Sequence, residues 1–275
     1  MKAVSSVFFP MSRLAVLLGA MLCCLPVGLA AQDADTANVS LPRAYRMRMV
    51  GIGSVNLLDT YLSPENYKGT EVRFVSLTSK PSRWKTLSQR IVHQGDVSVS
   101  HNRADNNDEL AGFYNFQYSL THDWQLTEAL SAWAGGGLDL TLGFVYNTRN
   151  SNNPAQAKAS LNLSPAAGLA YAFSVKGKPW VVRYDATVPL VGVMFSPNYG
   201  QSYYEIFNRG NYDHNVVPTT VVATPSLRQM LTLDLPLFGR RFVVGYLGDY
   251  QQAKVNKLKY HNYTHALVLG VAIWK

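Results

Sequence analysis

The 275-residue sequence has only two cysteines, Cys23 and Cys24, and both lie within its first thirty residues. That segment places Lys2 and Arg13, without any acidic residue, around the start of an apolar run that ends in small residues. This order is typical of a secretory signal peptide, so we expect residues 1–31 to be cleaved. The mature chain then contains no cysteine, which excludes the disulfide framework that stabilises many exported proteins.

Two alternatives for this segment are a membrane anchor and a lipoprotein signal. Pro26 and the small residues that follow it disfavour an anchor. Met21 and Leu22 stand where small residues would precede a lipidated cysteine, which disfavours the lipoprotein. An exported chain remains the prediction, with an extended segment at 32–42 before the folded domain.

The sequence also lacks any cluster of like charge. Its formal net charge of +8 falls to +6 when Lys2 and Arg13 are removed, and the remaining basic residues occur singly. No basic stretch marks a nucleic-acid face, and an exported protein would not normally meet nucleic acid. We therefore predict no nucleic-acid partner.

After the signal there is no run of about 18 apolar residues, which excludes a transmembrane helix. The chain instead alternates with a period of two, as a strand with two unlike faces does. In 129–148, for example, Leu138 and Leu140 alternate with Asp139 and Thr141. The same alternation recurs in 109–121, 157–174 and 226–236.

These stretches are long enough for the roughly 9–11 residues of a tilted membrane-crossing strand, whereas soluble strands average five or six. We predict an all-β fold: a transmembrane antiparallel up-and-down β-barrel occupying residues 43–275, with apolar faces toward lipid. The alternative is a secreted soluble sandwich or lipocalin-like barrel with leucines inside. The predicted strands, ten within a range of eight to twelve, cover about 43–57, 69–79, 89–103, 109–122, 129–148, 157–174, 179–194, 222–236, 240–251 and 261–274.

The connections between these strands alternate in length. Those after even-numbered strands are short, as in VKGK and LFGR, and those after odd-numbered strands are longer, including QAKVNKLKYHN. Outer-membrane barrels have short periplasmic turns and longer outer loops, so the pattern predicts the cell outer membrane of a Gram-negative bacterium. Many outer-membrane barrels end in a strand whose terminal aromatic is recognised by assembly machinery, and Trp274, followed here by Lys275, resembles that ending. The predicted partners are that machinery and outer-membrane lipid.

The polar strand faces would then line the lumen. Buried charges need partners, and a ten-stranded interior is narrow, so near-balanced charge predicts a largely filled polar lumen, with a narrow solute channel as an alternative. The predicted charge network comprises Arg46, Arg48, Glu71, Arg73, Asp96, Asp139, Lys158, Arg183, Asp185, Arg228 and Asp234.

No motif names a reaction. GIGSVN at 51–56 lacks the third glycine and the helix of a dinucleotide site, and the spacing of His261 and His265 falls in a predicted loop and strand. No histidine is followed two residues later by Ser or Thr, as lipid-hydrolysing barrels would require. We predict no catalytic residue, cofactor or metal. A barrel enzyme acting on lipid or peptide remains an alternative, with candidate acid–base groups His101 near Asp96 and the pair Asp213 and His214.

Five segments together resemble a family of uncharacterised outer-membrane barrel proteins of Bacteroidota, catalogued as a domain of unknown function. They are LDTYLSPENYKGTEVRF (58–74), RNSNNPAQAKA (149–159), PLVGVMFSPNYGQSYYEIF (189–207), PSLRQMLTLDLP (225–236) and QQAKVN (251–256). The resemblance covers nearly the whole mature chain. It implies export and a barrel-like fold, and it carries over no catalytic residue, ligand or partner.

The longest predicted loop, 195–224, is rich in aromatic residues. Long loops are usually functional or disordered, and aromatics are scarce in disordered segments. We therefore predict that this loop folds over or into the barrel mouth and acts as a plug, in preference to a ligand site. The candidate side chains are Tyr199, Tyr203, Tyr204 and Phe207.

Overall fold

The structure, a computed structural model, describes residues 44–84 and 86–274. The predicted signal peptide, 1–31, and the segment 32–42 lie outside the described residues. Most of the described chain is strand. The strands are β1 (Tyr45–Asp59), β2 (Tyr67–Pro81), β3 (Ser88–His101), β4 (Asp108–Gln125), β5 (Leu130–Asn147), β6 (Ala155–Val175), β7 (Lys178–Thr187), β8 (Val191–Phe195), β9 (Val216–Thr220), β10 (Leu227–Leu237), β11 (Arg240–Val255) and β12 (Leu258–Trp274), with one short helix, α2 (Tyr203–Phe207).

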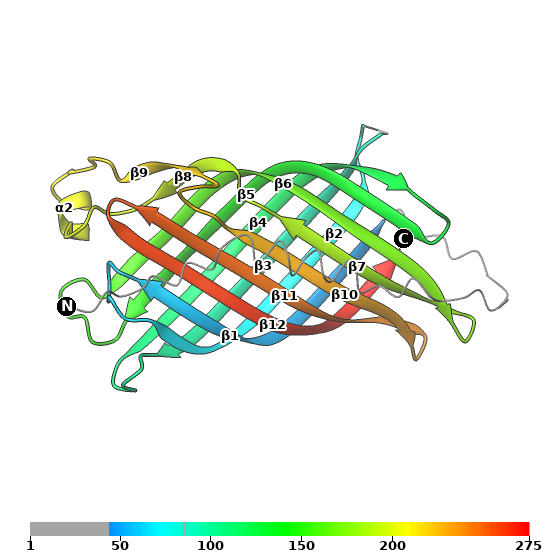
Figure 1. The fold of residues 1–275 in the computed structure, drawn as a ribbon, viewed down its shortest axis with the longest axis horizontal. Helices are drawn as coiled ribbons and strands as arrows, with labels where there is room; N and C mark the ends of the chain where they lie inside the picture. The colour runs from blue at the N-terminus through cyan, green and yellow to red at the C-terminus, as the bar shows by residue number, and fades with distance from the viewer. Residues whose placement is uncertain (1–43, 85, 275) are drawn as a thin grey trace, which may run out of the picture. The chain divides into compact units, whose positions relative to one another are not determined.

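The strands form a closed antiparallel barrel, seen from the side in Figure 1. β1 pairs with β2 on one side and with β12 on the other, so the first and last strands complete the wall. The remaining strands follow in sequence order around the barrel, which confirms the predicted antiparallel barrel of ten strands.

Twelve strand segments make ten barrel strands because two of the ten are interrupted. β7 and β8 both pair with β6, in consecutive stretches, and are separated by residues 188–190. β10 pairs with β7, and β9 pairs with β8, so residues 221–226 interrupt the next strand at the same level. Pro189 lies in the first interruption, where a residue without an N–H cannot continue the ladder.

The strands are staggered as well as closed. A ladder of paired residues that starts at Val50 reaches β6 at Ala159 through β2 to β5, and at Tyr171 through β12, β11, β10 and β7. These two positions on β6 are twelve residues apart, which is the shear of the barrel. Closure with such a stagger tilts the strands by about 40° to the barrel axis.

The two ends of the barrel differ. The end that holds Tyr45 and Trp274, here called the terminal end, has short turns at 82–87, 126–129, 176–177 and 238–239. The opposite end, here called the loop end, has connections at 60–66, 102–107, 148–154 and 196–215. The prediction of a long connection QAKVNKLKYHN was wrong. β11 and β12 are joined at the loop end by only Asn256 and Lys257. Both have positive φ, so a two-residue turn lets the strands extend to Val255 and Leu258.

Side chains alternate between the interior and the outer wall. Large apolar residues on the wall are exposed, including Val50, Ile52, Leu267 and Leu269 at 61–69 %. The interior holds two apolar groups, one around Met47 near the terminal end and one around Leu57 near the loop end, with charged residues between and beyond them. None of the helices among the described residues is long and apolar enough to cross a membrane.

Candidate functional site

A layer of charged side chains crosses the lumen between its two apolar groups. At its centre on β2 is the fully buried guanidinium of Arg73. Arg73 forms two hydrogen bonds to Glu71, at 3.0 and 2.8 Å, and ion pairs with Asp96 on β3 at 3.2 Å and Asp249 on β11 at 3.5 Å. It also donates to the hydroxyl of Thr264 on β12 at 2.9 Å. One cation therefore joins four strands.

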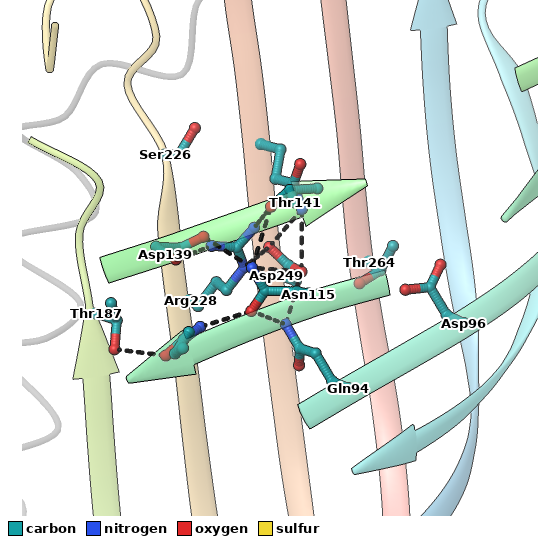
Figure 2. A network of polar contacts seen from close by, with 12 residues as sticks. Gln94, Asp96, Asn115, Asp139, Thr141, Thr187, Ser226, Arg228, Asp249 and Thr264 are labelled. Atoms are coloured by element: carbon teal, nitrogen blue, oxygen red, sulfur yellow. Dashed lines mark hydrogen bonds and ion pairs between the residues drawn. The ribbon is translucent and has the colours of Figure 1, made fainter. Parts of the chain in front are cut away.

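A second buried arginine extends this layer to the opposite wall. Arg228 on β10 pairs with Asp139 on β5 and donates to the Thr141 hydroxyl at 2.9 Å. It also contacts Asp249 at 3.3 Å, so this carboxylate lies between the two arginines. Asn115 on β4 donates to Asp139 at 2.7 Å. Figure 2 shows Arg228 between Asp139 and Asp249.

We call Glu71, Arg73, Asp96, Asp139, Arg228 and Asp249 the central layer. With their hydroxyl and amide partners they come from seven of the ten strands, β2 to β5 and β10 to β12. Four carboxylates surround two guanidinium groups, which places acidic groups in excess within a buried space. Charge-assisted hydrogen bonds of this kind fix geometry strongly and leave few alternative packings.

Two small cavities lie beside Arg228. One, of about 50 Å³, is lined by Val92, Trp133, Met230 and other residues on the terminal side. The other, of about 60 Å³, lies near the interruptions in the wall and is lined by Tyr260 and residues of β6, β8 and β9. Each is large enough for a few water molecules. Because Arg228 lines both cavities, its side chain lies between them.

A second charged group lies at the terminal end. Asp234 pairs with Arg183 at 3.2 Å and with Arg241 at 2.7 Å, and its Oδ2 accepts a hydrogen bond from the Trp274 indole at 2.8 Å. The Arg241 guanidinium also lies 3.4 Å from the centre of the Trp274 ring. Trp274 on β12 thus contacts a charged group that comes from β7, β10 and β11.

Two more charged pairs lie near the ends of the lumen. Arg90 pairs with Asp185 at the terminal end, and its guanidinium lies 3.8 Å from the centre of the Trp133 ring. At the loop end, Lys158 pairs with Asp59 at 2.8 Å. The lumen is therefore filled by charged and apolar layers along its length.

The structure places nine of the eleven predicted network residues in the interior and brings most of them into ion pairs. The prediction was wrong for Arg46 and Arg48. Both are exposed on the outer wall, while Met47 and Met49 point inward. The apolar residues of β1 occur on both faces, so the rule that apolar faces meet lipid assigned these arginines to the wrong side. The interior residues are Glu71, Arg73, Asp96, Asp139, Lys158, Arg183, Asp185, Arg228 and Asp234.

Sequence reasoning missed several interior charges. The alternation of strand faces would have found two of them. Arg90 lies on the same face of β3 as Asp96, and Glu109 lies on the same face of β4 as Asn115. No comparable signal was available for Asp59, which was assigned to a loop. The missed charges are Asp59, Arg90, Glu109, Arg241 and Asp249.

The connection 196–215, here called the cap, is tied to the loop-end rim by hydrogen bonds. Asn256, in the β11–β12 turn, donates to the carbonyls of Ser196, Pro197 and His214 at 3.1, 3.4 and 2.8 Å. From the β1–β2 connection, the Tyr61 hydroxyl donates to the Gln201 carbonyl at 2.9 Å. Polar side chains from two neighbouring connections thus hold the cap against the mouth of the barrel.

The four aromatic side chains predicted for the plug divide into two groups. Tyr203 lies at the rim, where its hydroxyl accepts a hydrogen bond from the Ala157 N–H at 2.6 Å and its ring packs edge-on against Tyr61. Burial raises the pKa of Tyr203 to about 12. Tyr199, Tyr204 and Phe207 are exposed by 72, 58 and 59 %. The buried apolar side chain of α2 is instead Ile206.

The short helix α2 is fixed at its N-terminus by a capping box. The Ser202 hydroxyl accepts from the Glu205 N–H at 3.3 Å, and the Glu205 carboxylate accepts from the Ser202 N–H at 2.8 Å. These hydrogen bonds to the carboxylate hold the pKa of Glu205 below its usual value. A stretch of five residues is too short to be stable alone, so this box and the rim contacts define its position.

The candidate acid–base groups do not assemble into a site. His101 points outward and hydrogen-bonds to Asp108 at 2.7 Å, whereas Asp96 points into the lumen. Asp213 and His214 pair at 2.6 Å, and both side chains are more than 70 % exposed. Within residues 44–84 and 86–274, no group of three or more His, Cys, Asp or Glu side chains is placed to hold a metal ion.

A family model described as "Protein of unknown function (DUF3316)" matches residues 16–273. This match confirms the predicted membership of a family of unknown function, while a Bacteroidota origin stays a prediction. None of the curated proteins compared with the chain matches it.

Several solved structures are similar in fold at low identity. The transport unit of the autotransporter AIDA-I from Escherichia coli has 10 % identity and a TM-score of 0.41, covering 94 % of this chain and 97 % of that one. Neisserial surface protein A has 14 % identity and a TM-score of 0.32, covering 83 % and 97 %. The attachment invasion locus protein of Yersinia pestis has 10 % identity and a TM-score of 0.30, covering 84 % and 99 %.

Proposed function

We propose that this chain, which belongs to the DUF3316 family of proteins of unknown function, is an integral outer-membrane barrel with a sealed lumen that holds its cap at the cell surface as a structural or binding element. The observation that carries the proposal is the inverted arrangement of the barrel: apolar side chains are exposed on the wall and charged side chains are buried inside. A soluble barrel would have the opposite arrangement, because exposed apolar surface costs free energy in water.

The outer wall supports membrane insertion. On β5, every second residue from Leu138 to Tyr146 is apolar and directed outward, and β6 continues this surface with Leu161 and Leu163. Exposed Trp84 lies at the terminal end, where aromatic residues of membrane barrels meet the lipid headgroups. Because the short turns share this end, we assign it to the periplasm and the cap to the cell exterior.

The central layer supports a sealed lumen over an open pore. A solute crossing the barrel would have to separate Arg73 or Arg228 from the carboxylates that each binds, and leaving a buried charge without its partner is costly. Ten strands also enclose far less space than the sixteen or more of open porins. The narrow channel that the sequence left open is therefore the less favoured role.

Two measurements test the proposal. In the native host, we expect the full-length protein in the outer-membrane fraction, with gel migration that changes on heating; a product found in the soluble periplasm or the medium would contradict it. In planar bilayers we expect the protein to show no steady conductance. An Arg228→Ala variant removes one of the two guanidinium groups of the central layer and the side chain that lines both cavities, so its conductance should exceed that of Arg209→Ala, an exposed change in the cap. Steady conductance of the unaltered protein would contradict the sealed lumen.

A further inference from the structure

The apolar wall is interrupted on β1, close to the terminal end. Arg46 and Arg48 point outward and are exposed, and the outward residues that follow them are apolar only at Val50 and Ile52 before the polar Ser54 and Asn56 and the half-buried Leu58. On β5 the outward apolar stretch covers nine residues, from Leu138 to Tyr146, close to what a membrane crossing needs. The outward face of β1 therefore has a much shorter continuous apolar stretch than that of β5.

The two arginines lie at the level of the apolar wall and not below it. In the ladder with β12, Arg46 is paired with Ile273 and Arg48 with Val271, and both partners are exposed apolar residues. The next pair, Val50 with Leu269, is apolar on both strands. Adjacent strands differ in height by only a few ångströms at such a tilt, so the lipid that meets β12 also meets these arginines.

The interruption continues across β2 and β3. Arg48 is paired with Ser76, and Ser76 in turn with His93, while Arg46 is paired with Thr78 and donates to its hydroxyl at 3.3 Å. Further basic groups lead from this area to the terminal end. We call the whole set the basic strip: Arg46, Arg48, Ser76, Thr78, Lys80, Arg83 and His93.

The basic strip has no acidic counterpart. The outward positions of β1, β2 and β3, all within the described chain, include no Asp or Glu, since Asp59, Glu71 and Asp96 all point inward. The ion pairs among described residues include neither Arg46 nor Arg48. The cost of an arginine that faces lipid without a partner rises with depth, from about 0–1 kcal/mol near the interface to about 2–4 kcal/mol at the bilayer centre.

We propose that the basic strip binds the phosphate headgroup of an anionic phospholipid from the leaflet at the terminal end. The inference rests on the membrane location proposed above. Two guanidinium groups two residues apart on one face can both donate to a phosphate, and the hydroxyl of Thr78 lies beside Arg46. Lys80 and Arg83 continue the positive surface toward the level at which headgroups normally lie.

A second copy of the chain fits this surface less well. In a two-fold dimer the same patch meets itself, which would set Arg46 and Arg48 of one copy against those of the other without any carboxylate between them. An anionic lipid brings the charge that the strip lacks. The charge of the strip therefore favours lipid over self-association.

The test measures phosphatidylglycerol retained by the purified full-length protein, by native mass spectrometry from detergent, across a titration of the lipid. The variant Arg46→Gln/Arg48→Gln should bind about thirtyfold more weakly, since each basic side chain beside an anionic lipid contributes about a factor of five. The matched control is Lys254→Gln/Lys259→Gln, which removes two exposed, paired lysines at the loop end. It should bind as the unaltered protein does, and Arg46→Lys/Arg48→Lys should retain most of the binding.

Equal binding by the Arg46→Gln/Arg48→Gln variant would overturn the proposal, as would equal loss in the lysine control, which would mean attraction to net charge alone. A dimer that forms through this wall, detected by crosslinking Thr78→Cys in the otherwise cysteine-free mature chain, would also overturn it. If the glutamine variant fails to fold, a loss in the Ser76→Ala/Thr78→Ala variant, without loss in the lysine control, decides the matter. A protein that never enters the outer membrane would instead contradict the proposed function, and the fractionation described above detects that separately.

Discussion

The central layer and the cap are both polar, and they are held in different ways. In the central layer, acidic and basic side chains from several strands hydrogen-bond to one another, with Asp249 shared between Arg73 and Arg228. In the cap, the contacts to the rim come from neutral donors such as Asn256 and the Tyr61 hydroxyl. The central layer joins strands on opposite sides of the lumen, whereas the cap is attached to the rim of the barrel by a few hydrogen bonds.

This difference predicts two separate scales of stability. Removing one charged side chain from the central layer leaves others buried without partners, so the free energy of unfolding of the whole barrel falls. Removing one neutral contact from the cap loosens a connection that has few buried apolar residues, among them Ile206. Segments of this kind open locally at a free energy well below that of global unfolding. We therefore expect the cap to open without any change in the central layer.

The largest effect is expected for Arg73→Ala. It leaves Glu71, Asp96 and Asp249 facing one another in a buried space, so we expect a loss of about 3–5 kcal/mol in the free energy of unfolding. Urea unfolding of the micelle-folded protein measures it. The matched control, Arg209→Ala in the cap, removes an exposed arginine that lies over the Tyr204 ring, and should change stability by less than about 0.5 kcal/mol. Equal midpoints for the two variants would remove the distinction between the regions.

The number of barrel strands and the character of their faces could be predicted from sequence because strand alternation is a local property. Leu138 and Asp139 show their two faces within two residues, and long stretches of such alternation leave little choice of fold class. The two interruptions in the wall were not predicted. Pro189 signals the first, but the second depends on pairing between β8 and β9 across the cap, which is not local.

The site was less predictable than the fold for two physical reasons. Alternation says that neighbouring residues differ in direction, yet it does not say which set points inward when both faces carry apolar residues, as Met47 and Val50 do on β1. That ambiguity placed Arg46 on the wrong side. In addition, the partners of Arg73 are up to 191 residues away in sequence, so the network exists only once the barrel closes.

An intermediate effect is expected for Asn256→Gly, which tests whether the cap opens independently of the barrel. Glycine tolerates the positive φ of this turn, so the change removes the donor to three cap carbonyls without straining the backbone. We expect the cap to open more easily by about 1–3 kcal/mol, seen as faster proteolysis between residues 196 and 215. The urea midpoint of the barrel should stay nearly unchanged.

The control for this experiment is Asp105→Gly, at another exposed position with positive φ at the loop end. It should leave proteolysis of the cap unaltered. If Asn256→Gly lowers the global midpoint as much as Arg73→Ala does, the cap is part of the cooperative unit and the two regions are not separate.

The smallest effect is expected for Ser202→Ala, which acts within the cap alone. Loss of an N-cap serine typically costs a helix about 1 kcal/mol, and α2 has only five residues over which to compensate.

The same capping box makes the cap sensitive to acid. Because the folded pKa of Glu205 lies below the ordinary value of 4.5, its contribution is present above pH 4.5 and is lost as the pH falls through the folded pKa. Hydrogen exchange across residues 202–208, followed from pH 6 to pH 3, should therefore show loosening at the acid end. Glu205→Gln should flatten that dependence, and Glu128→Gln, in a turn at the terminal end, should leave it intact. A pH dependence that survives Glu205→Gln would show that the acid response comes from elsewhere, with the central layer and its four carboxylates as the first region to examine.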